Sequence, residues 1–590
     1  MDNANNVSFE ILEPKAKLEN PKREGLKNPR LTDLNGKTIA FMTIHVGELV
    51  QLGSELFFDL LQEAFLKRYP GVKFYRCQSF GSPASIPNAD EIAEHCDAWV
   101  EGVKEAITQG KRDVGVFMER AGRPGVSICS EVLFRSKSAL QDLNGMPRVR
   151  LVTVPETDYC VAKRDPDLMR DVVEAACDKI IAALITPLTE EEKEDFVLDY
   201  DYSPKTFSGP TYHDAYEKFL QYCADNALSD GLPVVPPTRE NVEWMLTGTS
   251  YPRDKVIGYV YPKRGIATVE KIAIAAVMAG CKPEYLPVVI GIMDAFTDPN
   301  FNQFHVVNEI LPIIFLSGPI VKELGYNNKC GYLAPGVRIN AAIGRAVLMC
   351  MITIGWRDMT IYASPGGPGQ PAAYCNYIIP ENQDESPWES WAEQNGYTNG
   401  ESVVTICENT GINRGPGECM SNTTCQERIE QINRLFSRNG PLFSAFGMAK
   451  NGENSRHMIV LHPTMAKQLA LAGFDKKSFV EYLYKRNTID YDSMTEEERN
   501  ALREQLIREN AQKGMKWYNL TPEDLKPGLH LEPFHNMTDV LIIVSGSGAG
   551  NSMVFQTATG STAPGAEDVK EPRPWMTKVI GGATLTKAGR

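Results

Sequence analysis

Short apolar runs alternate with longer helical segments over the first third of the chain. Lys37–Ile44 is an apolar run typical of a buried strand, and Leu49–Tyr69 repeats Leu, Phe and Ala at helical spacing. Further strand-like runs and helical segments follow in turn, namely Val72–Cys77, Ala89–Thr108, Val114–Met118, Ser130–Leu143, Val149–Val154 and Pro166–Leu184. This alternation predicts an α/β domain over residues 31–190, with a doubly wound parallel sheet covered by helices on both faces.

Two segments flanking this domain lack such a pattern. Residues 1–30 are polar and carry Pro14, Pro21 and Pro29, which predicts an N-terminal arm that wraps a surface or stays mobile. Residues 191–211 are acidic and then aromatic, without a clear period, and we interpret them as a linker.

Residues 212–590 mix both kinds of segment, which predicts a larger mixed α/β domain. Its predicted strands are short apolar runs, namely Ile310–Phe315, Ile352–Trp356, Val403–Cys407, His457–Leu461 and Val540–Val544. Its predicted helices are His213–Asn226, Thr268–Ala279, Arg338–Met351, Cys425–Leu435, Thr464–Ala472, Ser478–Arg486 and Thr495–Glu509. We expect the chemistry to reside in this second domain.

Composition and charge narrow the class of protein. The 590 residues are 43% hydrophobic and 23% charged, as in an average globular protein, and the net charge of −14 argues against binding nucleic acid or anionic membranes. The first residues lack the pattern of a signal peptide and no apolar run is long enough to cross a bilayer, so we expect a cytoplasmic location. The 13 scattered cysteines fit reduced thiols better than a disulfide framework.

A glycine-rich loop directly follows the predicted strand Val540–Val544. Successive backbone N–H groups in such a loop can converge on an anion, with serine hydroxyls in support. The candidate anion-binding residues are Ser545, Gly546, Ser547, Gly548, Gly550 and Asn551. The spacing matches neither a dinucleotide fingerprint nor a P-loop, and a tight structural turn is the alternative.

Two arginines lie two helical turns apart at the start of a predicted helix. Arg338 and Arg345 therefore share a face and, with Asn340, could grip a carboxylate. Glu270 and Lys271 open another helix, and such charges are either paired or exposed around a cleft. They are candidates for proton transfer, and an ion-pair network between the arginines and Glu270 is the alternative.

Two further candidates for proton transfer lie on other segments. Glu381 and Asn382 share a proline-bounded loop with Trp388, and a carboxyl group beside an aromatic wall commonly has a raised pKa. The alternative is a solvated acidic loop. His305 and Glu309 are four residues apart and could form an acid/base pair or half of a metal site. No third ligand is visible, so no metal or other cofactor is predicted.

Cysteine chemistry is a separate candidate. Cys129 follows a glycine-bearing segment with Arg120 and Arg123, which could supply the electropositive setting that a reactive thiol needs. Cys419 and Cys425 lie close enough in sequence to interact. Buried cysteines are commonly just small apolar residues, which is the alternative for each.

Several motifs of the first domain, taken together, resemble the UGSC-type (seleno)protein domain. They are Leu34–Lys37, Ser82–Ala84, Glu94–Ala98 and Val149–Pro155. The resemblance implies an α/β fold and thiol or selenol chemistry at a selenocysteine or cysteine followed by Gly-Ser-Cys. The corresponding segment here, Glu119–Cys129, lacks that motif, so the redox role does not carry over. This half is then expected to be a scaffold or an anion-binding wall.

The second domain resembles the uncharacterised domain that is often joined to the first. The matching passages are Asp230–Pro233, Pro236–Thr238, Ala267–Lys271, Met278–Pro287, Ser317–Ile320, Gly336–Arg345, Glu381–Asn382, Ser386–Trp388 and Ser545–Ser552. This resemblance implies an architecture and no particular substrate.

The leading hypothesis is an enzyme that acts on a small anionic organic substrate by acid/base chemistry, of lyase, hydratase or isomerase type. The arginines and the glycine-rich loop would bind the anion. An alternative is a thiol-dependent reductase or C–S lyase, and another is a non-catalytic subunit of a larger complex. We expect a homo-oligomer.

Overall fold

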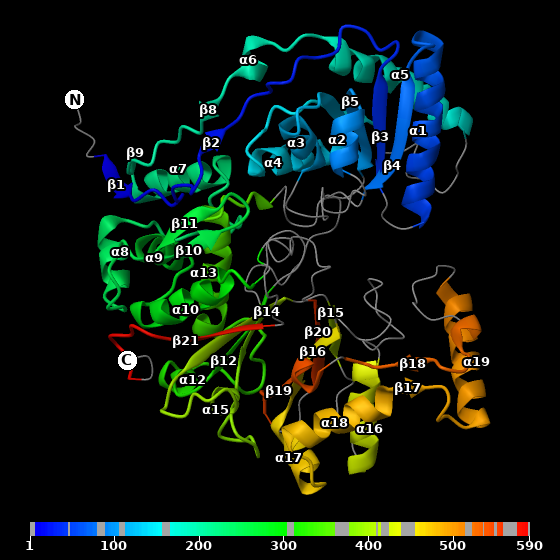
Figure 1. The fold of residues 1–590 in the computed structure, drawn as a ribbon. Coiled ribbons are helices and arrows are strands. Elements are labelled where there is room, and N and C mark those ends of the chain that lie inside the picture. The colour runs from blue at the N-terminus through cyan, green and yellow to red at the C-terminus, as the bar shows by residue number, and fades with distance from the viewer. Residues whose placement is uncertain are drawn as a thin grey trace.

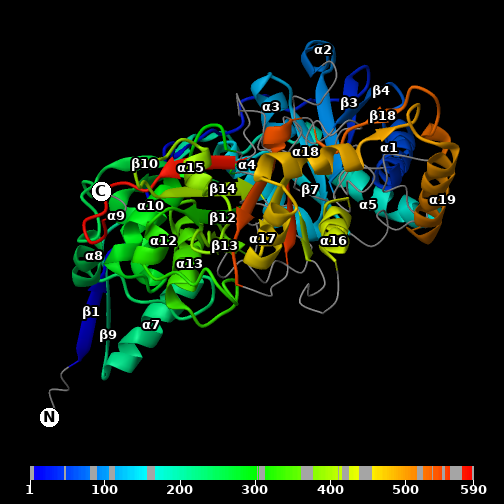
Figure 2. The same cartoon turned by 90° about the horizontal axis from the view of Figure 1, so that it is seen from below.

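The computed structural model describes most of the chain. The described residues are 6–44, 48–79, 89–104, 113–155, 166–301, 303, 312–359, 377–408, 411–414, 424–437, 455–513, 522–534, 536–547, 552–558 and 575–587. Figure 1 shows the N-terminal elements above and the C-terminal elements below, and Figure 2 gives the view from below. In these residues no helix combines the length and apolar character needed to cross a membrane.

The predicted N-terminal parallel sheet is confirmed. Five parallel strands lie in the order β4-β3-β5-β6-β7, with bounds β3 (Thr38–Ile44), β4 (Lys73–Ser79), β5 (Ala98–Lys104), β6 (Gly125–Ser130) and β7 (Leu151–Val154). Helices α1 (Glu48–Arg68) and α5 (Pro166–Ile185) cover one face through a single apolar cluster. Helices α2 (Ala89–His95) and α3 (Val114–Arg120) contribute to the cluster on the other face. Helix α4 (Phe134–Leu143) follows β6.

Two predicted elements of this domain were wrong, and one strand was missed. The helix expected over Ala89–Thr108 ends at His95, and the chain continues as the central strand β5, whose Trp99 and Val100 are fully buried. Val114–Met118, expected as a strand, is helical because Asp113 caps the helix by accepting from Val116 N at 3.1 Å. Strand β6 was missed, although all six of its residues are buried.

The first N-terminal residues lie along the surface of both halves of the molecule. Strand β1 (Val7–Ile11) pairs with β9 (Lys205–Gly209), and β2 (Lys22–Arg23) pairs with β8 (Phe196–Val197). Between these strands, Ala16 N donates to Thr353 O at 3.3 Å. The dark blue chain in Figure 1 follows this path from the lower half to the upper half. Residues 6–26 are called the arm below, and they wrap a surface. Residues 191–211, which were expected to be a linker, contain the strands β8 and β9 that pair with the arm.

The C-terminal half has four layers, which are helices, a sheet, a second sheet and helices. The first sheet has the order β13-β12-β14-β21, with bounds β12 (Pro312–Ser317), β13 (Tyr377–Pro380), β14 (Val403–Glu408) and β21 (Trp575–Val579). One of its faces packs on α9 (Val269–Met278), α10 (Leu286–Phe296) and α13 (Arg338–Thr353). The strand expected over Ile352–Trp356 was wrong, because α13 continues to Thr353 and Trp356 has a φ of +59°.

The second sheet packs against the other face of the first. Its order is β15-β20-β16-β19, with bounds β15 (Gly411–Arg414), β16 (Ser455–Leu461), β19 (Val540–Val544) and β20 (Met553–Ala558). Ile313 and Phe315 of the first sheet share an apolar cluster with Met458 and Ile543 of the second. The outer face is covered by α16 (Cys425–Ser437), α17 (Pro463–Leu471) and α18 (Lys476–Asn487). A larger mixed α/β part is thus confirmed.

Shorter or peripheral elements complete the described structure. They are α6 (Glu190–Lys193), α7 (Tyr212–Asp225), α8 (Arg239–Leu246), β10 (Val256–Val260), β11 (Gly265–Thr268), α12 (Ile320–Glu323), α15 (Trp391–Gln394), β17 (Ile489–Asp490), α19 (Glu496–Lys513) and β18 (His530–Leu531). Of these, α12 and α15 border the candidate site.

Candidate functional site

The candidate site lies where neighbouring strands end. Strands β12 and β13 are parallel, with Leu316 opposite Pro380, so the residues that follow them emerge at the same edge of the sheet. Asn382 N donates to Val544 O at 2.8 Å, which brings the end of β19 to this edge as well. The carboxyl ends of parallel strands are the usual place for ligand sites in α/β proteins.

Glu381 is the buried acidic group at this edge. Its side chain is inaccessible to solvent, and its carboxylate oxygens accept from Trp391 N at 3.2 and 3.1 Å. Ser317 also hydrogen-bonds the carboxylate, and Ser317 Oγ accepts from Ala392 N at 3.1 Å. These bonds hold the carboxyl group in one orientation.

A buried lysine faces this carboxylate. Lys476 Nζ lies 3.8 Å from Glu381 Oε1, and its side chain is 7% exposed. Burial raises the pKa of Glu381 above its usual value, although Lys476 opposes that shift. Burial likewise lowers the pKa of Lys476. Both shifts favour the neutral forms, as expected when charged groups are removed from water.

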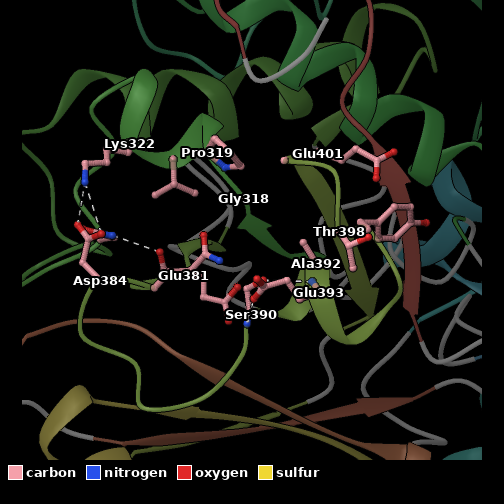
Figure 3. Close-up of a pocket in the computed structure, with 15 residues that line it drawn as sticks. Gly318, Pro319, Lys322, Glu381, Asp384, Ser390, Ala392, Glu393, Thr398 and Glu401 are labelled. Atoms are coloured by element: carbon pink, nitrogen blue, oxygen red, sulfur yellow. Dashed lines mark hydrogen bonds and ion pairs between the residues drawn. The ribbon is translucent and has the colours of Figure 1, made fainter.

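Glu381 lines a pocket of about 300 Å³ between α12 and α15. Figure 3 shows Glu381, Asp384, Glu393 and Glu401 around this pocket, with Lys322 beside Asp384. Lys322 Nζ lies 3.5 Å from Asp384 Oδ2. Four carboxyl groups against one lysine give this pocket an acidic lining.

A larger cavity of about 790 Å³ lies on the other side of α15. Lys476 and Trp391 line it, whereas Glu381 and Ala392 line the smaller pocket, and Tyr397 borders both. The Glu381–Lys476 pair therefore stands in the wall between the two cavities.

The described part of the glycine-rich loop contacts the same edge. Ser545 Oγ donates to Pro380 O at 2.7 Å, and Asn382 Nδ2 donates to Gly546 O at 2.7 Å. The N–H groups of Ser545 and Gly546 donate to Leu461 O and Asn328 O, each at 2.9 Å. Ser547 is partly buried, and Gly546 has a φ of +87°, a left-handed conformation that suits glycine. The amide donors of Ser545 and Gly546 are thus occupied by protein acceptors.

Asn340 and the two arginines on α13 also have protein partners. Arg345 binds Asp230 through two hydrogen bonds of 2.8 and 2.9 Å, and Arg338 donates to Gly280 O. Asn340 Nδ2 donates to Asn327 O at 2.9 Å. Neither arginine pairs with Glu270, because Arg345 forms its ion pair with Asp230 and Arg338 binds a backbone carbonyl.

The remaining sequence candidates lie at several places. Glu270 pairs with Arg253, and Lys271 Nζ donates to Glu13 O of the arm at 2.5 Å. Trp388 packs in the cluster beneath α18 and donates from its indole to Phe474 O at 3.1 Å. None of these lines either cavity among the described residues.

The thiol candidates are less accessible than the hypothesis of a reactive cysteine requires. Cys129 is fully buried in β6, and Cys425 is partly buried with Sγ 3.5 Å from Gln468 O. Cys419, His305, Glu309, Gly548, Gly550 and Asn551 lie outside the described residues. Within the described ranges, no three His, Cys, Asp or Glu side chains are grouped to hold a metal ion.

Sequence reasoning missed Lys476 and Ser317, which contact Glu381. Lys476 lies just before the predicted helix Ser478–Arg486, where it resembled any surface lysine, whereas in the structure it is the first residue of α18. Glu381 itself could have indicated a partner of this kind, because a buried carboxylate needs a compensating positive charge.

Comparison with known proteins gives a family match for the N-terminal part of the chain. The model of the UGSC family matches residues 10–186. The match begins within the arm, whereas the resemblance seen in the motifs began at residue 31. This part of the chain therefore carries a UGSC-type domain, and the assignment of the C-terminal half to its usual partner domain stays a prediction. No curated protein matches the chain.

Proposed function

We propose that the protein is an enzyme that transfers protons to or from a small organic acid, in a reaction of lyase, hydratase or isomerase type. Glu381 is the proposed general acid or base. The observation that carries the proposal is a fully buried carboxyl group, held by Trp391 N and Ser317, that lines a cavity. Ordinary carboxyl groups of folded proteins are mostly exposed, so this one has an unusual environment.

The environment of Glu381 suits this role for a physical reason. A general acid or base works best when its pKa lies near the working pH, and burial raises the pKa of Glu381 in that direction. The proposed step breaks a C–H bond next to a carboxylate or carbonyl group, and its proton forms an O–H bond on Glu381. The electron pair moves toward the substrate oxygen, so the step needs no redox partner.

The acidic lining constrains how the substrate would lie. Asp384, Glu393 and Glu401 repel a second anion, so the part of the substrate in the smaller pocket would carry hydroxyl or amine groups. The anionic end would lie away from these carboxylates.

Exchange of hydrogen with solvent tests the proposal, because it reports on proton transfer whatever product is formed. The protein would be incubated in D₂O with a panel of small hydroxy, amino and unsaturated acids, and deuterium incorporation measured by mass spectrometry. Glu381→Gln is expected to lower exchange of any active compound at least about 100-fold, since general acid/base groups contribute about 10²–10⁴-fold.

Glu323→Gln provides the control. Glu323 lies in α12 beside the pocket without lining it, and glutamine can still accept from Lys587 N. Exchange by this variant should equal that of the wild type. Full exchange by Glu381→Gln would exclude Glu381 as the proton-transfer group.

A further inference from the structure

The larger cavity has an aromatic wall. Trp391, Tyr397 and Trp575 line it, and the rings of Trp391 and Trp575 meet edge to face with centroids 5.9 Å apart. At about 790 Å³ the cavity lies within the range of small-molecule sites in proteins, roughly 300–1,000 Å³. Flat aromatic surfaces bind planar ligand groups at little conformational cost.

A buried ammonium group lines the same cavity with one donor unused. Lys476 Nζ donates to Glu389 O at 2.9 Å and to Gln394 Oε1 at 3.2 Å. Its ion-pair partner, Glu381 Oε1, lies 3.8 Å away, beyond hydrogen-bond distance. A buried charge with an unused donor is costly, and an acceptor from a ligand would relieve that cost.

The charge of this cavity is opposite to that of its neighbour. Lys476 and Lys477 line it, and Asp539 is the single carboxylate among its described lining residues. Asp539 is itself engaged, since its Oδ2 accepts from Asn536 N at 2.8 Å. The larger cavity thus favours an anion, whereas the smaller pocket favours hydroxyl or amine groups.

We propose that the larger cavity binds an aromatic carboxylic acid. Its carboxylate would lie at Lys476 and Lys477 and its ring against Trp575 and Tyr397. The carboxylate bound there would be the anionic end of the substrate. That this ligand takes part in a reaction rests on the proposed function above. Lys476, 3.8 Å from Glu381, would then join the bound carboxylate to the wall that the two cavities share.

Direct binding to the full-length protein tests this assignment. Isothermal titration calorimetry and saturation-transfer NMR would compare benzoate, benzyl alcohol and cyclohexanecarboxylate. Benzoate is expected to bind at least tenfold more tightly than benzyl alcohol, which lacks the charge. Cyclohexanecarboxylate, which lacks the flat ring, should bind about fivefold more weakly than benzoate.

Substitutions inside and outside the larger cavity test whether benzoate binds there. Lys477→Glu, at an exposed position, is expected to weaken benzoate binding at least tenfold, and Trp575→Leu about fivefold. Lys485→Glu makes the same charge change on α18 at an exposed position outside the cavity, and should leave binding unchanged. Equal binding by wild type and Lys477→Glu, or equal loss in both charge variants, would overturn the proposal.

The two proposals can fail separately. If benzoate binds and depends on Lys477 while Glu381→Gln retains deuterium exchange, the cavity assignment stands and the proposed role of Glu381 fails. If exchange depends on Glu381 and no aromatic acid binds, the cavity assignment fails alone.

Discussion

Lys271 lies partly buried beneath the arm, where its ammonium group donates to a backbone carbonyl and not to a carboxylate. Burial lowers its pKa from 10.5 to about 8. Between pH 8 and pH 10 the unfolded chain keeps a proton on this lysine that the folded protein has released. Unfolding therefore takes up a proton, and stability contributed by this group rises with pH across that window.

Lys271→Met should remove this dependence. We expect the wild type to gain stability relative to the variant between pH 8 and pH 10, on the order of 1–3 kcal/mol, because each pKa unit corresponds to about 1.4 kcal/mol. Urea unfolding at pH 7.5, 8.5, 9.5 and 10 measures the difference. Lys485→Met, at an exposed position, should give a constant difference, and a constant difference for Lys271→Met would refute the assignment.

Single residues also show what the sequence could and could not predict. Glu381 and Asn382 were identified because prolines place them on a loop that they share with Trp388. Their partners could not be identified, because Lys476 and Ser317 reach Glu381 only once two sheets have packed. Arg338 and Arg345 were correctly placed at the start of a helix, yet their acceptors depend on tertiary contacts.

At the scale of elements, two of the errors came from short apolar runs. Val114–Met118 and Ile352–Trp356 are apolar enough for a buried strand or a buried helix, and their period does not distinguish the two. The cap at Asp113 decides the first case. Long periodic segments such as α1, α5 and α13 were predicted correctly, because many residues support one period.

The arm is an element that yields a mutational test. Ile11 is fully buried in the core that α9, α10 and α13 form, and β1 also pairs with β9. Ile11→Ala is expected to cost about 2–4 kcal/mol, as for other truncations of buried aliphatic side chains. Glu10→Ala, at an exposed neighbouring position, should change stability by less than about 0.5 kcal/mol.

Denaturant unfolding and limited proteolysis check this expectation. Ile11→Ala should also accelerate cleavage within the arm. Equal stability of the two variants would show that the arm contributes no packing energy.

At the scale of the whole molecule, one carboxylate joins three parts of the chain. Asp142 of α4 binds Arg23 of the arm at 2.6 Å and Lys263 of the C-terminal half at 2.7 Å. Burial alone would raise the pKa of Asp142, but Lys263 and Arg23 outweigh it and hold that pKa below its usual value. Leu140 of the same helix belongs to the C-terminal core.

Asp142→Asn should weaken the connection between the halves. The variant leaves two cations without their carboxylate, and we expect a loss of about 1–3 kcal/mol and a separation of thermal unfolding into two transitions. Arg135→Ala breaks the exposed ion pair with Asp358 across the same boundary and should have little effect. Scanning calorimetry compares them, and a single unchanged transition for Asp142→Asn would contradict the expectation.

The path of the arm has a consequence for synthesis on the ribosome. Trp356 donates from its indole to Ala16 O, a contact between residues 340 positions apart. At roughly 5–20 residues per second, Ala16 is made about 17–70 seconds before Trp356 has been translated. The stretch around Ala16 therefore emerges without its C-terminal contact, within reach of chaperones and proteases, whereas β1 and β2 can pair with β9 and β8 as soon as residues 196–209 are made.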